Sequence, residues 1–468
     1  MEQNLGNSVP QPAPVPSSQN NSAPSATIAP AIQTQQPNPN SQPMAVPTTP
    51  PAQSPKTWTI LTALTILIIL GTGGYFVYTK TQKQNQKQPT PTAPSTSKVN
   101  IAQSGFDSAI FKTTYQSEKN KNVFISPYSI EMALKLVLNG ASGTTKNEIS
   151  QALELVNKTD DTINREAQAN MQRILELDPQ VEMNIANSIW VQDKMQLKKN
   201  FQTLAQNNYQ AEVGNVDFGS PKALETINNW VNQKTKEKIK KVFEKLGSDT
   251  VSVLVNAIYF KGKWTNEFDK LNTQNQTFYL DDGTEKEHPI MNNSGYYQYF
   301  ENSELQAIKM PYGEKKFSMN IFLPNKNTNI NEFIAGITDE KITLWISDLE
   351  QKDGDISIPS FKFSYEIPNF IQALNNLGIE QVFTGLSKLD KIVENKNLFI
   401  TQAVHKAYID TDETGTEAAA VTGLAMEVTA TIPVDDRFAM ICNRPFFFVI
   451  QDDIGTNLFM GAILNPEV

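Results

Sequence analysis

The first 97 residues most limit what this chain can fold into, because they cannot form an ordinary globular domain. They hold 16 of the chain's 27 prolines. Their only charged side chains are Glu2, Lys56, Lys80, Lys83 and Lys87. Residues 1–56 are rich in Pro, Gln, Asn, Ser and Ala and lack the apolar periodicity that could offset the entropy of ordering. We therefore predict a disordered tail over 1–56 and expect later residues to build the fold.

An uncharged run of 23 residues, 57–79, lies between Lys56 and Lys80. A transmembrane helix needs about 20 apolar residues, so this run predicts a transmembrane helix over 57–79. A buried soluble helix is the alternative, but the flanking segments offer nothing to bury it against. A cleaved signal peptide fits less well, because such peptides begin near the N-terminus. Residues 80–98 are polar and predict a tether that leads into one large domain, 99–468.

Charge and composition exclude several functions for residues 98–468. The whole chain carries −9 and the first 97 residues carry +3, which leaves −12 on this part. An acidic domain without a basic stripe is not expected to bind nucleic acid. The histidines are His288 and His405 and the cysteine is Cys442, too few for the three or four ligands of a zinc site. We predict no metal, no cofactor and no internal disulfide.

Helical and extended patterns alternate irregularly along the large domain. Ser126 and Pro127 predict a helix start, because Ser caps a helix and Pro suits its first position. Thr145 and Glu148 have the spacing of a capping box and predict the start of the next helix. Further helices are predicted near 162–177, 198–208 and 221–245. β-branched runs predict strands at 181–192, 251–260, 315–323, 399–411, 446–451 and 457–464. This order predicts an α+β domain with large sheets.

Residues 413–434 carry a strict two-residue alternation after Gly415. One face has small and apolar side chains from Thr416 to Val428, whereas Glu417 and Glu427 lie on the other face. Such alternation is typical of a half-buried strand. An ordinary sheet strand explains it, and so does an exposed loop that can enter a sheet later.

A series of motifs over 100–468 resembles the serpin family. The match opens with NVFISPYSIEMALKLVLNGASGTTKNEI and closes with GTNLFMGAILNP. The matching segments follow the family's order: 122–149, 186–192, 216–218, 227–235, 254–268, 310–324, 405–420, 442–450 and 455–466. The resemblance implies a serpin fold with three β-sheets, about eight to nine helices and an exposed reactive-centre loop.

The resemblance also implies roles for individual residues. The polar cluster under the central sheet, called the shutter, matches Ser126, Ser129, Asn256 and His405. Trp190 matches the aromatic residue at the top of this sheet. The hinge that precedes the reactive-centre loop matches Glu413, Gly415, Thr416, Glu417, Ala418, Ala419 and Ala420. Two features depart from the family: Thr414 stands where charged residues are common, and the segment between Phe438 and Pro445 is slightly long.

A serpin of the inhibitory kind is a suicide substrate, whose cleaved loop enters the central sheet and traps the acyl-enzyme. The small hinge side chains favour this function, because a charge buried without a partner there would cost several kcal/mol. Non-inhibitory members, which act as binding or chaperone modules, tend to carry bulky or charged hinges and are the alternative. A serine hydrolase is disfavoured, because the chain has no G-x-S-x-G motif and His288 is expected at the surface. We predict no enzymatic activity.

The family's spacing, counted from Glu413, places the scissile bond at Thr429–Ala430. No Lys or Arg lies between Lys406 and Arg437, so a trypsin-like protease has no cationic side chain to hold. The predicted partner is an elastase-like or subtilisin-like serine protease, with a cysteine protease as the second possibility. The domain is expected to be a monomer.

Two arguments disagree about the side of the membrane on which the large domain is expected. One lysine precedes the predicted span closely and three follow it, which favours a cytoplasmic domain. Serpins mostly meet secreted proteases, which favours the outside. Because the lysine bias is small, we expect a single-pass membrane protein with an extracellular serpin domain.

Overall fold

The computed structural model describes residues 105–118, 120–394, 397–416 and 437–468. All of them belong to the second of two units of the chain, which begins at residue 92. The predicted tail, membrane span and tether, 1–98, lie outside the described residues. In the part that is described, no helix has the length and apolar character needed to cross a membrane. On this finding the prediction of a single-pass membrane protein is corrected, because nothing in the structure supports it.

The described residues form nine α-helices and fifteen strands. The helices are α3 (Phe106–Ser117), α4 (Pro127–Gly140), α5 (Gly143–Ala152), α6 (Asp160–Glu176), α7 (Lys199–Tyr209), α8 (Pro221–Lys234), α9 (Ile330–Ala335), α10 (Asp339–Ser347) and α11 (Phe370–Asn376). The strands are β1 (Val123–Ile125), β2 (Val181–Gln192), β3 (Glu212–Val216), β4 (Ser252–Lys263), β5 (Gln274–Tyr279), β6 (Glu285–Glu301), β7 (Leu305–Tyr312), β8 (Phe317–Pro324), β9 (Glu350–Pro359), β10 (Phe361–Glu366), β11 (Gln402–Asp412), β12 (Gly415–Thr416), β13 (Phe438–Ile441), β14 (Phe446–Asp452) and β15 (Asn457–Ile463). The predicted α+β class is confirmed.

The six-stranded sheet has the order β10-β11-β12-β4-β2-β3. Its strands β2 and β4 pair antiparallel over eleven residues. On the other side of β4, residues 253–259 pair in parallel with 402–408 of β11. This parallel seam between β4 and β11 positions the candidate site.

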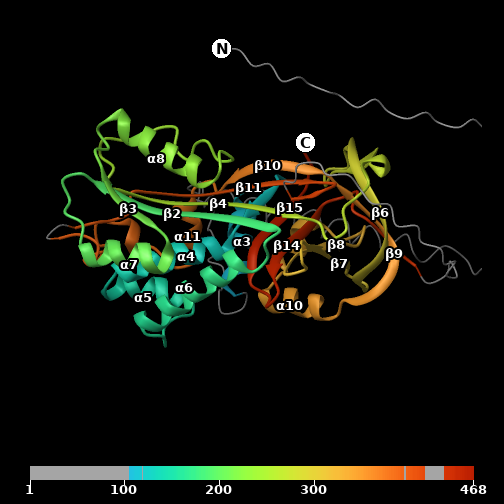
Figure 1. Cartoon of the computed structure of the whole chain (residues 1–468), viewed down its shortest axis with the longest axis horizontal. Coiled ribbons are helices and arrows are strands. Elements are labelled where there is room, and N and C mark those ends of the chain that lie inside the picture. The colour runs from blue at the N-terminus through green and yellow to red at the C-terminus, as the bar shows by residue number, and fades with distance from the viewer. Residues whose placement is uncertain (1–104, 119, 395–396, 417–436) are drawn as a thin grey trace, which may run out of the picture. The chain divides into compact units, whose positions relative to one another are not determined.

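Helices cover both faces of the six-stranded sheet. In Figure 1, α8 lies on one face and α4, α5, α6 and α7 lie on the other. Ile227 of α8 is in one buried cluster with Val255 and Tyr259 of β4. Leu254 and Ile258, which alternate with them, join the main core with residues of α4. Because both faces of β4 are buried, its sequence is almost continuously apolar rather than alternating.

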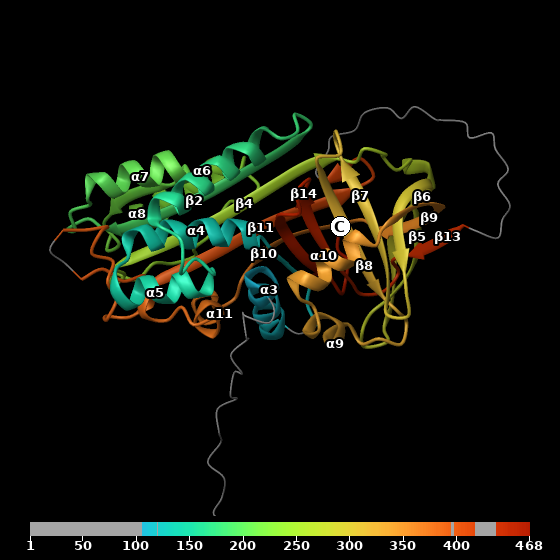
Figure 2. The ribbon, with the colours of Figure 1, turned by 90° about the horizontal axis from the view of Figure 1, so that it is seen from below.

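The second sheet has nine strands in the order β1-β15-β14-β8-β7-β6-β9-β13, with β5 paired to β6. Figure 2 shows this sheet at the other end of the domain from α5 and α7. The hydrogen bonds therefore form two continuous networks among the described strands, where three sheets were expected. The reason is the 17-residue β6, which pairs with β5 at its start and with β7 at its end and so links their strands.

Two helix boundaries differ from the prediction. Ser126 caps α4 as expected, since its side chain accepts a hydrogen bond from the Ser129 N–H. However, α5 begins at Gly143, before the predicted capping box, and the Glu148 carboxylate instead accepts hydrogen bonds from the backbone of 380–381. Helix α8 ends at Lys234 rather than 245, because the Asn228 side chain bonds the backbone of 242–243 and turns the chain back.

Candidate functional site

The site begins at the turn that joins β11 to β12 at one end of the six-stranded sheet. Gly415 and Thr416 form β12, which returns antiparallel between β11 and β4. The Asp412 carboxylate holds the turn by accepting hydrogen bonds from the Thr414 N–H at 2.8 Å and the Thr414 hydroxyl at 2.6 Å. A Cβ on Gly415 would lie 2.1 Å from the Gly262 carbonyl oxygen, and φ is +150°, so this position requires glycine.

Residues that follow β4 anchor this turn. The backbone N–H of Trp264 donates to the Thr414 carbonyl at 2.9 Å, and its indole N–H donates to the Asp412 carbonyl at 2.9 Å. The Phe268 N–H donates to the Glu413 carbonyl at 2.8 Å. Three successive carbonyl groups of the turn are therefore satisfied from one neighbouring segment, which fixes the start of the hinge.

Thr416 is already inside the sheet. Its exposed fraction is 1%, and its hydroxyl oxygen lies 2.8 Å from the hydroxyl oxygen of Tyr312. The Tyr312 ring stacks on Trp264, with centroids 4.4 Å apart and an angle of 12° between the planes. Burial raises the pKa of the Tyr312 hydroxyl far above its ordinary value, so the phenol stays protonated. The remaining predicted residues, Glu417, Ala418, Ala419, Ala420, Thr429 and Ala430, lie outside the described residues.

The four predicted shutter residues lie together beneath the seam. His405 and Asn256 are register partners in β11 and β4, and their side chains share a hydrogen bond between Nδ1 and Oδ1. The Asn256 amide lies 2.6 Å from the Ser129 hydroxyl oxygen, to which it donates. Ser126, at the start of α4, donates its N–H to His405 Nε2 at 3.1 Å. The N-terminal turn of α4 is thus bonded to both strands of the seam.

His405 is neutral in this arrangement. Its Nε2 accepts from a backbone N–H, so the ring proton lies on Nδ1 and is donated to Asn256. Burial lowers the pKa of His405 to about 3, because a positive charge would be desolvated there. The side chain is fully buried, and its hydrogen-bond partners among the described residues are the Ser126 N–H and the Asn256 side chain, not a carboxylate. His405 therefore acts as a hydrogen-bonding link across the seam.

Comparison with known proteins identifies the family. The family model described as "Serpin (serine protease inhibitor)" matches residues 102–466. This match covers far more than half of the chain. The chain belongs to the serpin family.

Individual serpins resemble it over most of their length. A serine protease inhibitor of Cyanea capillata is 32% identical over 356 residues, which cover 74% of this chain and 93% of that protein. Serpin B4 of Homo sapiens is 30% identical over 377 residues, 75% of this chain and 95% of its own length. The crystal structure of the thermophilic serpin tengpin in its native state is 28% identical with a TM-score of 0.71, covering 77% of this chain and 92% of tengpin. The predicted serpin fold is confirmed.

The predicted place of Trp190 in this serpin is corrected. Trp190 pairs with Val253 at the start of β4, whereas Thr416, which is predicted to belong to the hinge, pairs with Gly262 near the end of β4. About nine residues of strand, roughly 30 Å, separate the two positions. Trp190 instead packs edge-on against Trp230 of α8. The aromatic residue beside the hinge is Trp264, which lies in the matching segment 254–268 but was not singled out.

The sequence prediction also missed Tyr312 and Asn187. Asn187 is the register partner of Asn256 in β2, and its Oδ1 accepts a hydrogen bond from the Asn256 amide. A single amide within the buried run of β2 was the available signal for this residue. Nothing in the sequence indicates that Tyr312, from the other sheet, reaches Thr416.

The predicted surface position of His288 is wrong. His288 is 2% exposed within β6, and its Nε2 hydrogen-bonds the Ser360 carbonyl. Its pKa is lowered, chiefly by burial. Cys442 is also fully buried, which raises the pKa of its thiol to about 12 and keeps it protonated. Neither side chain is placed to act as an exposed nucleophile or base.

Proposed function

We propose that this serpin is a suicide-substrate inhibitor of serine proteases, which traps the acyl-enzyme by inserting its cleaved loop between β4 and β11. The observation that carries the proposal is β12. Gly415 and Thr416 occupy the entrance of the seam, paired with both strands. A chain that continued inward from Thr416 would become a new central strand.

The proposed chemistry uses the protease's own catalytic serine. Its hydroxyl oxygen attacks the carbonyl carbon of Thr429, the bond to the nitrogen of Ala430 breaks, and the new amine of Ala430 leaves with the proton. An ester then joins Thr429 to the protease. If residues 417–429 insert before water attacks this ester, the protease is carried away from its substrate site and stays attached.

Insertion is favourable by a count of hydrogen bonds. The parallel ladder between β4 and β11, which has seven register pairs, is lost when the seam opens. A strand of 13 residues, 417–429, can pair on both of its sides and forms more bonds than are lost. At about 1 kcal/mol net per bond, the gain is on the order of 10 kcal/mol. Since this is comparable with the stability of a whole domain, the uncleaved form is proposed to persist for kinetic reasons.

In this proposal the shutter residues hold β4 and β11 together until the loop inserts. The hydrogen bond between His405 and Asn256 crosses the seam that must open. Because both side chains are neutral, separating them exposes no buried charge. Ser126 and Ser129 hold the same pair from α4, so opening also requires α4 to shift or its bonds to break.

The proposed target is an elastase-like or subtilisin-like serine protease, with a cysteine protease as the second possibility. Support comes from the absence of Lys and Arg between Lys406 and Arg437. No enzymatic activity is proposed for the chain itself. The alternative function is that of a binding module. Thyroxine-binding globulin in complex with thyroxine, 25% identical with a TM-score of 0.71, is a solved structure of similar fold.

The test is to incubate the serpin with pancreatic elastase, subtilisin, papain and trypsin and to look for a covalent complex on denaturing gels. We expect complex with elastase or subtilisin, and mass spectrometry of the released C-terminal fragment is expected to begin at Ala430. Ala418→Arg is the matched variant, since its loop can still be cleaved but would bury a charge on insertion. Cleavage without complex by every protease would favour the binding module.

A further inference from the structure

Two adjoining pockets lie beside the strand that follows segment 417–436. The larger has a volume of about 460 Å³ and is lined by the turn after β5, by the chain after β8 and by the connection from β13 to β14. The smaller, of about 300 Å³, shares Lys326 and Arg444 with it and adds Ala439 and Ile441 of β13. Together they form one cleft with two cations at the junction.

Arg444 is half-buried at this junction. Its Nε and Nη2 groups donate to the Pro324 carbonyl at 3.1 and 2.8 Å, which fixes the side chain. Within the described part of the chain, no carboxylate forms an ion pair with Arg444. Burial lowers the pKa of its guanidinium. A partly desolvated charge is normally compensated by a counter-charge, and the described residues supply no ion-pair partner for Arg444.

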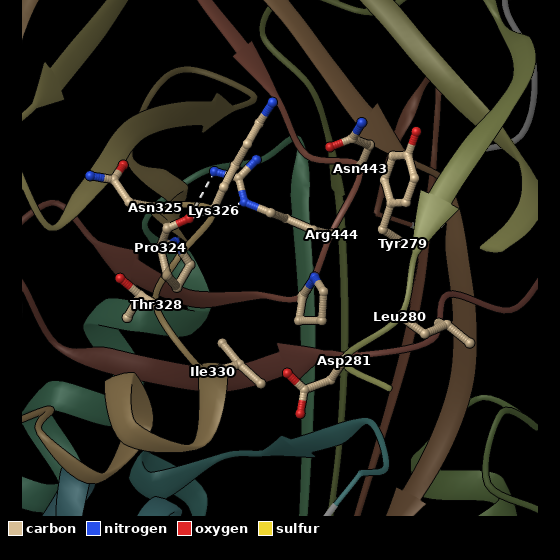
Figure 3. Close-up of a pocket in the computed structure, with 11 residues that line it drawn as sticks. Tyr279, Leu280, Asp281, Pro324, Asn325, Lys326, Thr328, Ile330, Asn443 and Arg444 are labelled. Carbon is tan, nitrogen blue, oxygen red and sulfur yellow. Dashed lines mark hydrogen bonds between the residues drawn. The ribbon is translucent and has the colours of Figure 1, made fainter. Parts of the chain in front are cut away.

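Lys326 adds a second cation at the same place. It is exposed, and none of the ion pairs among the described residues involves it. In Figure 3 the side chains of Lys326 and Arg444 lie next to each other, whereas Asp281 lies apart from them, near Ile330. Asp281 accepts a hydrogen bond from the Asn331 amide at 3.3 Å. One end of the larger pocket is therefore positive and the other end is apolar with a single acid.

We propose that this cleft binds a monoanionic carboxylate with an apolar body. The carboxylate would sit on Arg444 and Lys326, where charge-assisted hydrogen bonds are strongest. The body would lie against Leu280, Ile330 and Pro445, and a volume of about 460 Å³ accommodates an aryl-alkyl acid. A polyanion is disfavoured, because Asp281 lines the same pocket and would repel a second negative charge. The proposed carboxylate site does not require that the protein inhibit a protease.

The test uses 4-phenylbutyrate and its neutral counterpart 4-phenylbutyramide with the full chain in low-salt buffer. Ligand-observed saturation-transfer NMR gives the dissociation constants by titration. We expect saturable binding of the acid and about tenfold weaker binding of the amide, since only the acid makes charge-assisted hydrogen bonds. Lys326→Gln and Arg444→Gln are expected to weaken binding of the acid, and Asp281→Asn is expected to strengthen it. Arg165→Gln, which removes an exposed cation of α6, is the matched control and should leave binding unchanged.

Arg444→Gln could disturb folding, because it removes the bonds to Pro324. Lys326→Gln cannot do so by this route, since Lys326 is exposed, and it keeps the test decisive. Equal binding of the acid and the amide would overturn the proposal. Lack of saturable binding to the wild type, or binding that Lys326→Gln leaves unchanged, would overturn it as well.

Discussion

Lowering the pH from 7.5 to 5 is expected to destabilise this serpin through His405. The imidazole is held neutral in the folded protein, where its pKa is lowered to about 3 by burial, from 6.5 in the unfolded chain. Between these two values the unfolded chain binds a proton that the folded protein does not. The free energy of unfolding therefore falls as the pH drops below about 6.5. At pH 5 the loss is about 2 kcal/mol, because each of the roughly 1.5 pH units contributes about 1.4 kcal/mol.

Other buried groups change stability over the same range. The pKa of His288 is also lowered by burial, so it acts in the same direction. The pKa of Asp107 is raised, chiefly by burial and then by the charge of Asp339, and that of Asp339 is raised by burial. These two carboxyl groups bind protons more readily in the folded protein and act in the opposite direction. A pH profile of the wild type alone thus mixes several contributions.

The substitution His405→Gln isolates the effect. A glutamine can donate to Asn256 and accept from the Ser126 N–H, as the neutral ring does, but it does not titrate. The assay is urea unfolding of both proteins at half-unit steps from pH 7.5 to 5. The difference in unfolding free energy between them should shift by about 2 kcal/mol in favour of the variant as the pH falls. His288→Gln removes the other buried histidine, whose pKa is also lowered, and its difference from the wild type should shift in the same direction. If the difference in unfolding free energy between the wild type and His405→Gln stays constant from pH 7.5 to 5, the reasoning is refuted.

Three further predictions concern the hinge and the loop. Tyr312→Phe should lower the unfolding free energy, measured by chemical denaturation, by about 1 kcal/mol, because it removes one hydrogen bond to Thr416. An unchanged denaturation midpoint would contradict a stabilising role of this hydrogen bond. Because Thr416 is already buried in the intact protein, the charge that tests insertion is placed on Ala418. The variant Ala418→Arg should be cleaved at the wild-type rate, while formation of the covalent complex, measured by gel densitometry, should fall at least tenfold. Equal complex formation by the variant and the wild type would count against insertion. Cleavage at Thr429–Ala430 should raise the melting temperature in calorimetry, since the freed strand can join the sheet, and a fall after cleavage would disagree with this expectation.

The structure brings the four residues predicted for the shutter together, whereas it places Trp190 far from Thr416. Ser126, Ser129, Asn256 and His405 lie in matching motifs, and the register of β4 and β11 together with the start of α4 brings their side chains within hydrogen-bond distance. Trp190 lies near the end of β2, and β2 runs antiparallel to β4. The ends of these two strands therefore lie at opposite ends of the sheet, which is why the position of Trp190 was predicted wrongly. A motif records the order of residues but not the direction in which its strand runs.

Contacts between the two sheets also could not be predicted from the sequence. The hydroxyl of Tyr312 meets Thr416 only because the end of β7 packs against the end of β4. The supposed capping box at 145–148 failed for a related reason, because the Thr145 and Glu148 side chains are used by the distant residues 380–381. In each case the role of the side chain depends on a partner that is distant in the sequence, which local spacing does not reveal.

The central claim is that residues 417–429 become a strand between β4 and β11 after cleavage. Hydrogen–deuterium exchange of this segment tests it most directly, measured in intact serpin, in loop-cleaved serpin and in loop-cleaved Ala418→Arg. We expect fast exchange in the intact protein, protection by several orders of magnitude after cleavage of the wild type, and no such protection in the variant. Fast exchange of 417–429 in the cleaved wild type would contradict strand insertion.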